Sequence, residues 1–216
     1  IVGGQYLVFG RSDGFPATLA PSEWVGAGAY RLVGAQIGAV APAGDVNGDG
    51  IDDLIIGDQW FGSYRGASYV LYGGDAHLQG LDSADGKAAG VLSLSELDGV
   101  HGFRLDGVTG GGSYYTSDLS GCSVASAGDV DGDGLVDLLI GSLRAVNGRG
   151  AAYLVFGGAP NLQALDTLDG NADGIISLAR LDGAKGYRVL GIDPEVVGPN
   201  GWFRYFNGDA CGQSVS

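Results

Sequence analysis

The sequence predicts an all-β fold of repeated four-stranded sheets, and three observations support this prediction. The segment GDVNGDGIDDLIIG at 44–57 recurs almost unchanged as GDVDGDGLVDLLIG at 128–141. The flanking segments repeat at the same spacing of 84 residues, so that Phe103 corresponds to Tyr187. Glycine accounts for 43 of the 216 residues and separates short apolar runs. Tandem units of four short strands are typical of β-propeller blades.

Each complete unit contains four predicted strands. In the first unit, 30–74, they are YRLVG, IGAVAPAGDV, DLIIG and ASYVLYGG, at 30–34, 37–46, 53–57 and 67–74. In the second unit, 103–158, they are FRLDG, GCSVASAGDV, DLLIG and AAYLVFGG, at 103–107, 121–130, 137–141 and 151–158. Apolar runs this short, bounded by glycine, favour buried strands over helices.

Partial units are predicted at both ends of the chain. YLVFG at 6–10 matches the third strand of a blade, so 1–10 is interpreted as the end of a preceding blade. YRVLG at 187–191 and GQSVS at 212–216 match opening strands, so 187–216 is interpreted as the start of a following one. Three blades cannot close a ring, because propellers use about four to eight. We therefore expect 1–216 to be part of a larger propeller; assembly from several copies is the alternative.

Oxygen-bearing side chains alternate in both copies of the repeated loop. In the first copy, positions 1, 3, 5, 7 (through its carbonyl) and 9 are Asp45, Asn47, Asp49, Ile51 and Asp53. In the second copy, they are Asp129, Asp131, Asp133, Leu135 and Asp137. Such hard oxygen donors suit Ca²⁺, and glycines allow the sharp turn. The pattern resembles the first half of an EF-hand loop, but a strand follows it instead of a helix.

An ordinary tight turn is the alternative for these loops, because Asp, Asn and Gly also bond to their own backbone. Two loops with the same spacing, each holding several carboxylates, would however repel strongly without a cation. The sequence therefore predicts two Ca²⁺ sites.

Two matched connectors, 81–102 and 165–186, link the units. The second carries a third candidate Ca²⁺ loop, whose corresponding positions are Asp169, Asn171, Asp173, Ile175 and Ser177. In the first connector Lys87 and Ala89 replace two of these ligands, so we expect no metal there. The SLSEL and SLARL segments are compatible with a short helical turn.

One motif carries a family resemblance. Residues 156–160 read FGGAP, and acidic loops begin at Asp45 and Asp129. With this strand order, nearly the whole chain resembles the FG-GAP repeats of integrin α-subunit propellers and their bacterial secreted relatives. The resemblance implies a seven-bladed propeller with Ca²⁺ in hairpin loops on one face and ligands bound by loops on the other. The chain departs from that pattern in having only two complete units.

Aromatic residues concentrate in loops that differ between the repeats, and these are the candidate ligand-binding residues. They are Trp60, Phe61, Tyr64, Tyr114, Tyr115, Trp202, Phe203, Tyr205 and Phe206. Flat rings at loop tips bind sugars and protein partners well. The alternative is that these loops fold back and bury their own rings.

Composition limits the possible partners and location. The formal net charge of −14 argues against nucleic acid and anionic membranes as partners. No apolar run reaches the ~18 residues that a membrane helix needs. The chain opens without Met or a basic leader, and acidic calcium loops fit an extracellular or cell-surface setting. Cys122 and Cys211 are able either to pair or to stay free.

Catalysis finds little support in the sequence. His77 and His101 have no Ser or Cys partner nearby, no GxSxG elbow occurs, and both are expected at the surface or in turns. We therefore predict a non-enzymatic calcium-binding module for adhesion, ligand binding or scaffolding, with a protein or carbohydrate ligand. One alternative is a subunit that self-assembles into a surface filament. The other is an accessory domain of a polysaccharide- or lipid-degrading enzyme.

Overall fold

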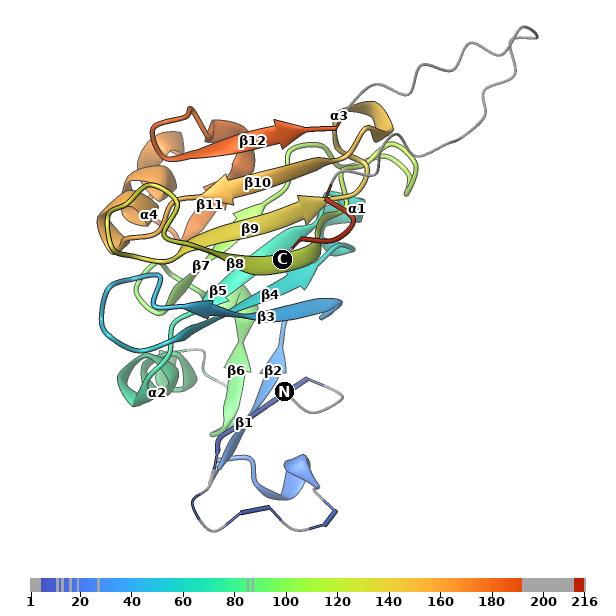
Figure 1. Cartoon of the computed structure of the whole chain (residues 1–216). Coiled ribbons are helices and arrows are strands. Elements are labelled where there is room, and N and C mark those ends of the chain that lie inside the picture. The colour runs from blue at the N-terminus through green and yellow to red at the C-terminus, as the bar shows by residue number, and fades with distance from the viewer. Residues whose placement is uncertain are drawn as a thin grey trace, which may run out of the picture.

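The computed structural model contains three β-sheets, which are stacked one above another (Figure 1). The structure describes residues 5–191, except 11, 13, 16, 19, 27, 85 and 87, together with residues 212–215. Strands dominate this part of the chain, and most neighbouring strands are antiparallel, which confirms the predicted all-β class of propeller-like blades. None of the helices in the described part is long and apolar enough to cross a bilayer.

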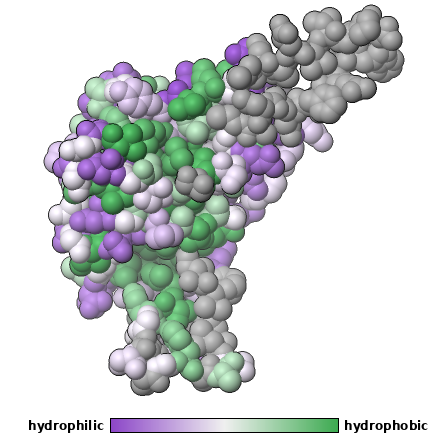
Figure 2. Space-filling model, viewed as in Figure 1, coloured by the Kyte–Doolittle hydropathy of each residue, from purple (hydrophilic) through white to green (hydrophobic). Residues whose placement is uncertain are grey.

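Sheet A is the smallest sheet and lies at the bottom of Figure 1. Its order is β1-β2-β6, formed by Tyr6–Val8, Ala29–Val33 and Val91–Ser93. β2 pairs antiparallel with β1 and parallel with β6. A short 3-10 helix, η1 (Pro21–Glu23), precedes β2. Figure 2 shows apolar residues on the surface of this narrow lower part.

Sheets B and C are the two complete blades. Sheet B has the order β11-β7-β5-β4-β3, formed by Ile175–Ser177, Gly102–Asp106, Ala67–Leu71, Asp53–Asp58 and Ala39–Gly44. Sheet C has the order β12-β10-β9-β8, formed by Gly186–Leu190, Ala151–Val155, Asp137–Ser142 and Ser120–Gly128. β3 and β4 pack against β8, so the two blades lie face to face.

Hydrogen bonding shifts the blades by one strand from the predicted units 30–74 and 103–158. The strand at 29–33 pairs with β1 in sheet A and therefore closes the preceding sheet. The strand at 102–106 closes sheet B, and the strand at 186–190 closes sheet C instead of opening a following blade. Residues 212–215, expected to begin a strand, form a turn and bends.

The apolar DLIIG run is continuous because sheet B is covered on both faces. Ile55 of β4 belongs to the core between sheets B and C, and its neighbour Ile56 belongs to the core between sheets A and B. Both side chains are fully buried. Successive side chains of a strand point to opposite faces. A strand buried on both sides therefore loses the alternating pattern that marks a half-exposed one.

The connectors contain more structure than the sequence indicated. A helix, α2 (Asp75–Ala84) or α4 (Ala159–Asp166), leads into each connector, which then contains the parallel strand β6 or β11. The 3-10 helices η2 (Leu94–Glu96) and η4 (Leu178–Arg180) confirm the short helical turns expected there. A further 3-10 turn, η3 (Thr167–Asp169), follows α4. Each connector thus adds an outer strand to an earlier sheet.

The acidic loops and the aromatic loops lie at opposite ends of the blades. The acidic loops join β3 to β4 and β8 to β9, on the side of α2 and α4 (Figure 1). The far ends of β4 and β9 lead into the one-turn helices α1 (Phe61–Tyr64) and α3 (Ala145–Gly148). The aromatic loop at 108–119 lies at this second end, because Leu119 N–H donates to the Tyr64 carbonyl at 3.0 Å.

Candidate metal centre and ligand surface

The first acidic loop curls around the carboxylate of Asp45. Its Oδ1 accepts N–H groups from Gly48 at 2.8 Å and Asp49 at 3.1 Å, and its Oδ2 accepts that of Gly50 at 2.8 Å. Gly48 and Gly50 have φ of 86° and 85°, a left-handed region that glycine enters without strain. The carboxylate at position 1 therefore fixes the turn.

The second acidic loop has the same construction. Asp129 Oδ1 accepts from Gly132 N–H at 2.7 Å, and its Oδ2 accepts from Gly134 N–H at 3.0 Å. Further along, Asp133 N–H donates to Asp131 and Leu135 N–H donates to Asp133. The sequence repeat is thus a repeat of loop geometry.

Three side chains of the second loop fit a common cation. Asp129, Asp131 and Asp133 each place one carboxylate oxygen within 4.8 Å of the others, and all three are exposed. Oxygens that share one Ca²⁺ at about 2.3–2.6 Å lie within roughly twice that distance of each other. None of the salt bridges found among the described residues involves this trio. The donor set is therefore compatible with Ca²⁺.

The first loop differs from the second at position 3, where Asn47 replaces an acid. Asn47 Nδ2 donates to Asp49 Oδ2 at 3.0 Å, and its Oδ1 accepts Asp49 N–H at 2.9 Å. Ile51, at position 7, donates its N–H to Asp49 Oδ1 at 2.8 Å. The neutral amide leaves this loop with one carboxylate fewer than its counterpart at the five predicted ligand positions.

The position 9 carboxylates brace the hairpins. Asp53 is 4% exposed, and its two oxygens accept N–H groups from Val46 at 3.0 Å and Gly73 at 2.8 Å. Burial raises the pKa of Asp53 to about 6. Asp137 is fully buried and accepts in the same way from Val130 and Gly157, and burial raises its pKa too. Each carboxylate thus connects the start of its loop to the end of the third strand.

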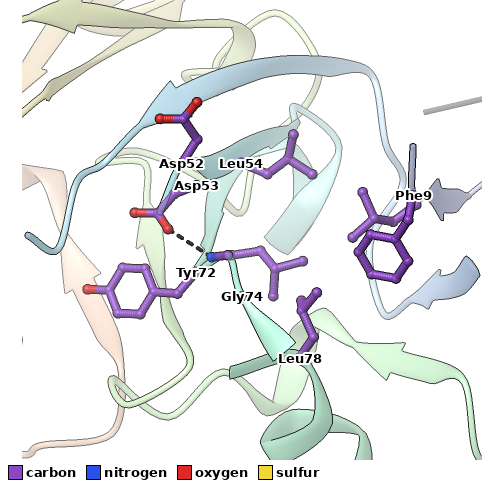
Figure 3. Close-up of a pocket in the computed structure, with 10 residues that line it drawn as sticks. Phe9, Asp52, Asp53, Leu54, Tyr72, Gly74 and Leu78 are labelled. Atoms are coloured by element: carbon purple, nitrogen blue, oxygen red, sulfur yellow. Dashed lines mark hydrogen bonds between the residues drawn. The ribbon is translucent and has the colours of Figure 1, made fainter. Parts of the chain in front are cut away.

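Asp53 also borders a small pocket between sheets A and B. The pocket has a volume of about 210 Å³ and is lined largely by apolar side chains, including Phe9, Leu54 and Leu78 (Figure 3). The Asp53 carboxylate points towards the Gly73 N–H in this view. Because its oxygens are engaged by the backbone, Asp53 holds the hairpin closed beside the pocket.

The two acidic loops are in direct contact. Val136 N–H donates to the Asp45 carbonyl at 3.2 Å, and Gly158 N–H donates to the Val46 carbonyl at 2.7 Å. These bonds join the first loop to the second loop and to the segment that follows β10. If one loop becomes more or less ordered, these backbone hydrogen bonds therefore affect the other loop.

His77 lies beside the first loop, and His101 packs against His77; no sequence pattern indicates this contact. His77 Nε2 is 3.4 Å from Asp49 Oδ2, and the rings of His77 and His101 are 5.8 Å apart. His77 lies on α2 and stacks edge-on against Tyr72. Both histidines are half-buried: His101 lies in a bend, as expected, whereas His77 lies on α2, which folds back over the loop.

The third candidate loop has a mixed environment. Asp169 accepts Asn171 N–H at 2.9 Å, and Asp173 accepts Ile175 N–H at 3.1 Å. Arg180 Nη1 donates to the Leu168 carbonyl at 2.9 Å, which places a cation next to the loop. Ser177 ends β11. Metal binding here stays a prediction.

Four of the predicted ligand-binding aromatics form one cluster at the opposite end of the blades. Trp60 contacts Tyr64 and stacks on Tyr114, with ring centroids 5.8 and 6.0 Å apart. Tyr114 contacts Tyr115 at 5.4 Å. Trp60 is 39% exposed and Tyr115 is 65% exposed. We call these four residues the aromatic cluster.

Arg144, which the sequence analysis did not identify, completes this surface. Its guanidinium carbon lies 4.7 Å from the Tyr114 ring centre and 5.1 Å from that of Tyr115. Phe61 faces elsewhere, since it packs against Tyr69 and beneath the Arg104 guanidinium. The other predicted aromatics, Trp202, Phe203, Tyr205 and Phe206, lie outside the described residues, as does Cys211.

The short helices α1 and α3 contain residues with left-handed backbone conformation. Gly62, Ser63 and Tyr64 have φ of 56°, 56° and 69°, and residues 146–148 repeat this conformation with Val146 at 54°. A β-branched residue with positive φ is a genuine outlier. Such strain persists only where surrounding structure enforces it, and it clusters at functional sites. The same end of the molecule carries the aromatic cluster.

Asp118 closes the aromatic loop. It is 2% exposed, and its Oδ2 accepts N–H groups from Val108 at 2.9 Å and Thr109 at 2.8 Å. Its own carbonyl accepts Arg144 N–H at 3.1 Å. Asp118 therefore connects the start of the loop at 108 to the residue that stacks on Tyr114.

Burial raises the pKa of Asp118, which gives a testable pH dependence. The folded chain holds the Asp118 proton more tightly than the unfolded chain, so this stability is fully present below the unfolded pKa of about 3.9 and is lost as pH rises through the folded value. Asp118→Asn cannot titrate. The wild-type advantage over this variant should therefore be largest at acid pH and fall to a plateau, measured by urea unfolding between about pH 3.5 and 7. A pH-independent difference would contradict the assignment.

Comparison with protein families supports the repeat assignment. The family model described as FG-GAP repeat matches residues 37–71 and 123–155. Both matches run from the first strand of a blade through the acidic loop to the third strand. They confirm the resemblance carried by the FGGAP motif and the two loops.

Proposed function

Because the chain carries two FG-GAP repeats, we propose that it is a calcium-stabilised, ligand-binding β-propeller module of an extracellular protein. The observation that carries the calcium assignment is the convergence of three exposed carboxylates at Asp129, Asp131 and Asp133. Bound Ca²⁺ would neutralise their charge. Asp129, Asp131 and Asp133 would hold the ion in the second loop, and Asp45, Asn47 and Asp49 in the first.

The calcium has a structural role in this proposal. The loops contact each other, and the buried Asp53 and Asp137 tie them to the strand ends. An ion in each loop makes the junction between sheets B and C rigid. Millimolar extracellular Ca²⁺ is sufficient to occupy weak sites of this type.

Ligand binding is assigned to the aromatic cluster at the opposite end. Exposed Trp and Tyr rings supply large contact area with few rotatable bonds, and the guanidinium of Arg144 adds a fixed positive charge. Such a surface suits a carbohydrate or protein ligand. The module is assigned to binding and not to catalysis, because the buried acids Asp53, Asp118 and Asp137 are engaged by backbone N–H groups.

Alanine substitution of the exposed rings tests the ligand surface. We expect Trp60→Ala and Tyr115→Ala to weaken ligand binding at least about tenfold, since aromatic anchors dominate binding energy. The assay is affinity electrophoresis against a panel of soluble polysaccharides, with immobilised surface proteins as a second panel. Phe15→Ala is the matched control, because Phe15 is 52% exposed and lies in another part of the chain. Equal binding by all three variants would refute the site.

A further inference from the structure

Sheets A and B end in the same way, with a parallel strand supplied by a connector. β6 covers the outer edge of β2, and β11 covers the outer edge of β7. Arg31 N–H donates to the Gly90 carbonyl at 2.8 Å, and Arg104 N–H donates to the Gly174 carbonyl at 2.9 Å. The register is also the same, because each arginine lies opposite the residue after that glycine. The same edge arrangement therefore occurs twice in the chain.

Each covering strand inserts two aliphatic side chains into a core. In β11 and the turn after it, Ile176 is fully buried and Leu178 is 1% exposed. The corresponding residues of the first connector, Leu92 and Leu94, have the same burial. The shared pattern, which we call the connector pattern, is Gly, two aliphatic residues, Ser and Leu, at 90–94 and 174–178.

β12 is a third edge of the same type. It pairs with β10 in the register that β7 adopts with β5, so Gly186 lies opposite Val155 as Gly102 lies opposite Leu71. Both glycines have φ of 142°. Figure 1 shows β12 as the uppermost strand, and no strand in the described part of the chain lies beyond it.

One face of β12, next to this open edge, exposes apolar side chains whose counterparts in β7 are buried. Tyr187 is 51% exposed, whereas the corresponding Phe103 is fully buried. Val189 is 55% exposed, whereas Leu105 is fully buried. In Figure 2 apolar residues show at the upper rim, where Figure 1 places β12. Exposed apolar edge strands are sites of strand addition.

We propose that the outer edge of β12 is a docking site for an extended partner segment that carries the connector pattern. The segment adds in parallel, its glycine carbonyl accepts the Arg188 N–H, and its second aliphatic residue and Leu pack beside β12. Intact copies of this chain do not supply it, because both of their connector strands are already paired. The partner is therefore a further segment of this sequence type.

A labelled peptide with the sequence of residues 171–184, NADGIISLARLDGA, tests this proposal by fluorescence anisotropy. We expect saturable binding to the wild-type chain. A control peptide with aspartate in place of Ile176 and Leu178 should bind at least about tenfold more weakly, because burial of either aliphatic chain is worth about that factor or more.

Two variants at one position separate docking on β12 from exchange with β11. Arg188→Pro removes the outward N–H, and proline is tolerated on a strand edge that faces away from its partner. The Arg188→Pro substitution should abolish binding of the peptide. Arg188→Ala keeps the N–H and should bind within about threefold of the wild type, since only the side chain changes. Circular dichroism of both variants reports whether they fold.

Several results would overturn the proposal. They are absence of peptide binding to the wild type, equal binding of the aspartate peptide, and undiminished binding to a folded Arg188→Pro variant. Light scattering could give a further result that overturns the proposal. A dimer of the wild type that Arg188→Pro dissociates would show that a second copy occupies the edge instead.

Discussion

Removal of calcium with EDTA should lower the melting temperature of this chain by roughly 10–20 °C. At a free Ca²⁺ concentration of 100 times the dissociation constant, each site contributes about 2.7 kcal/mol, so two sites contribute about 5 kcal/mol. For chains of this size each kcal/mol corresponds to about 2–4 °C. The physical cause is the repulsion of clustered carboxylates, such as the trio Asp129, Asp131 and Asp133, when no ion is bound.

Paired substitution in the second loop assigns the ion to its ligands. Asp129→Ala with Asp133→Ala should reduce the calcium stoichiometry by about one, measured by isothermal titration calorimetry. Asp182→Ala is the control, because Asp182 also accepts two backbone N–H groups, from Ala184 and Lys185, in an exposed turn. An EDTA melt unchanged from the calcium-loaded one, or full stoichiometry in the double variant, would contradict the assignment.

The contact between the loops gives the same experiment a second readout. Val136, in the second loop, donates to the Asp45 carbonyl of the first. Loss of the ion from the second loop should loosen this bond and weaken calcium binding at the first. The calorimetric curve of the double variant should therefore show a lower affinity for the remaining ion as well as a lower stoichiometry.

The local parts of this structure could be predicted from the sequence because their determinants are close together. The acidic loops depend on side chains two residues apart, and their turns depend on glycines within the same loop. DLIIG was assigned as a buried strand, and β4 is indeed covered on both faces. The blade boundaries were not recovered, because a repeat has no intrinsic starting point. Only strand pairings, such as that of β7 with β5, show where a blade ends.

The remaining site features depend on contacts distant in sequence. His77 approaches Asp49 only because α2 folds back, and Arg144 reaches Tyr115 only when sheets B and C are packed. The three-residue strands β6 and β11 are too short to be distinguished from turns by periodicity. Their parallel partners lie about 60 to 70 residues away in the sequence, so no local pattern predicts this pairing.

The glycine that ends DLIIG explains how closely the blades approach. A methyl group on Gly57 would overlap the carbonyl oxygen of Gly121 in sheet C. Gly141, which ends DLLIG, meets the Gly212 carbonyl in the same way. At Gly57 the two nearest atoms belong to the Gly121 backbone, so no flexible side chain can move aside there. The motif therefore requires glycine for the packing between successive blades.

Gly57→Ala should consequently lower the free energy of unfolding by about 3 kcal/mol, the upper range for overpacking, because the inserted methyl must separate two backbones. Gly38→Ala is the matched control: the nearest atom to a methyl there, the Gly57 carbonyl oxygen, is 3.8 Å away, and its φ is not in the left-handed region. That variant should stay within about 0.5 kcal/mol of the wild type. Urea denaturation in calcium measures both. Equal stability of the two variants would mean that sheets B and C are not held in backbone contact in solution.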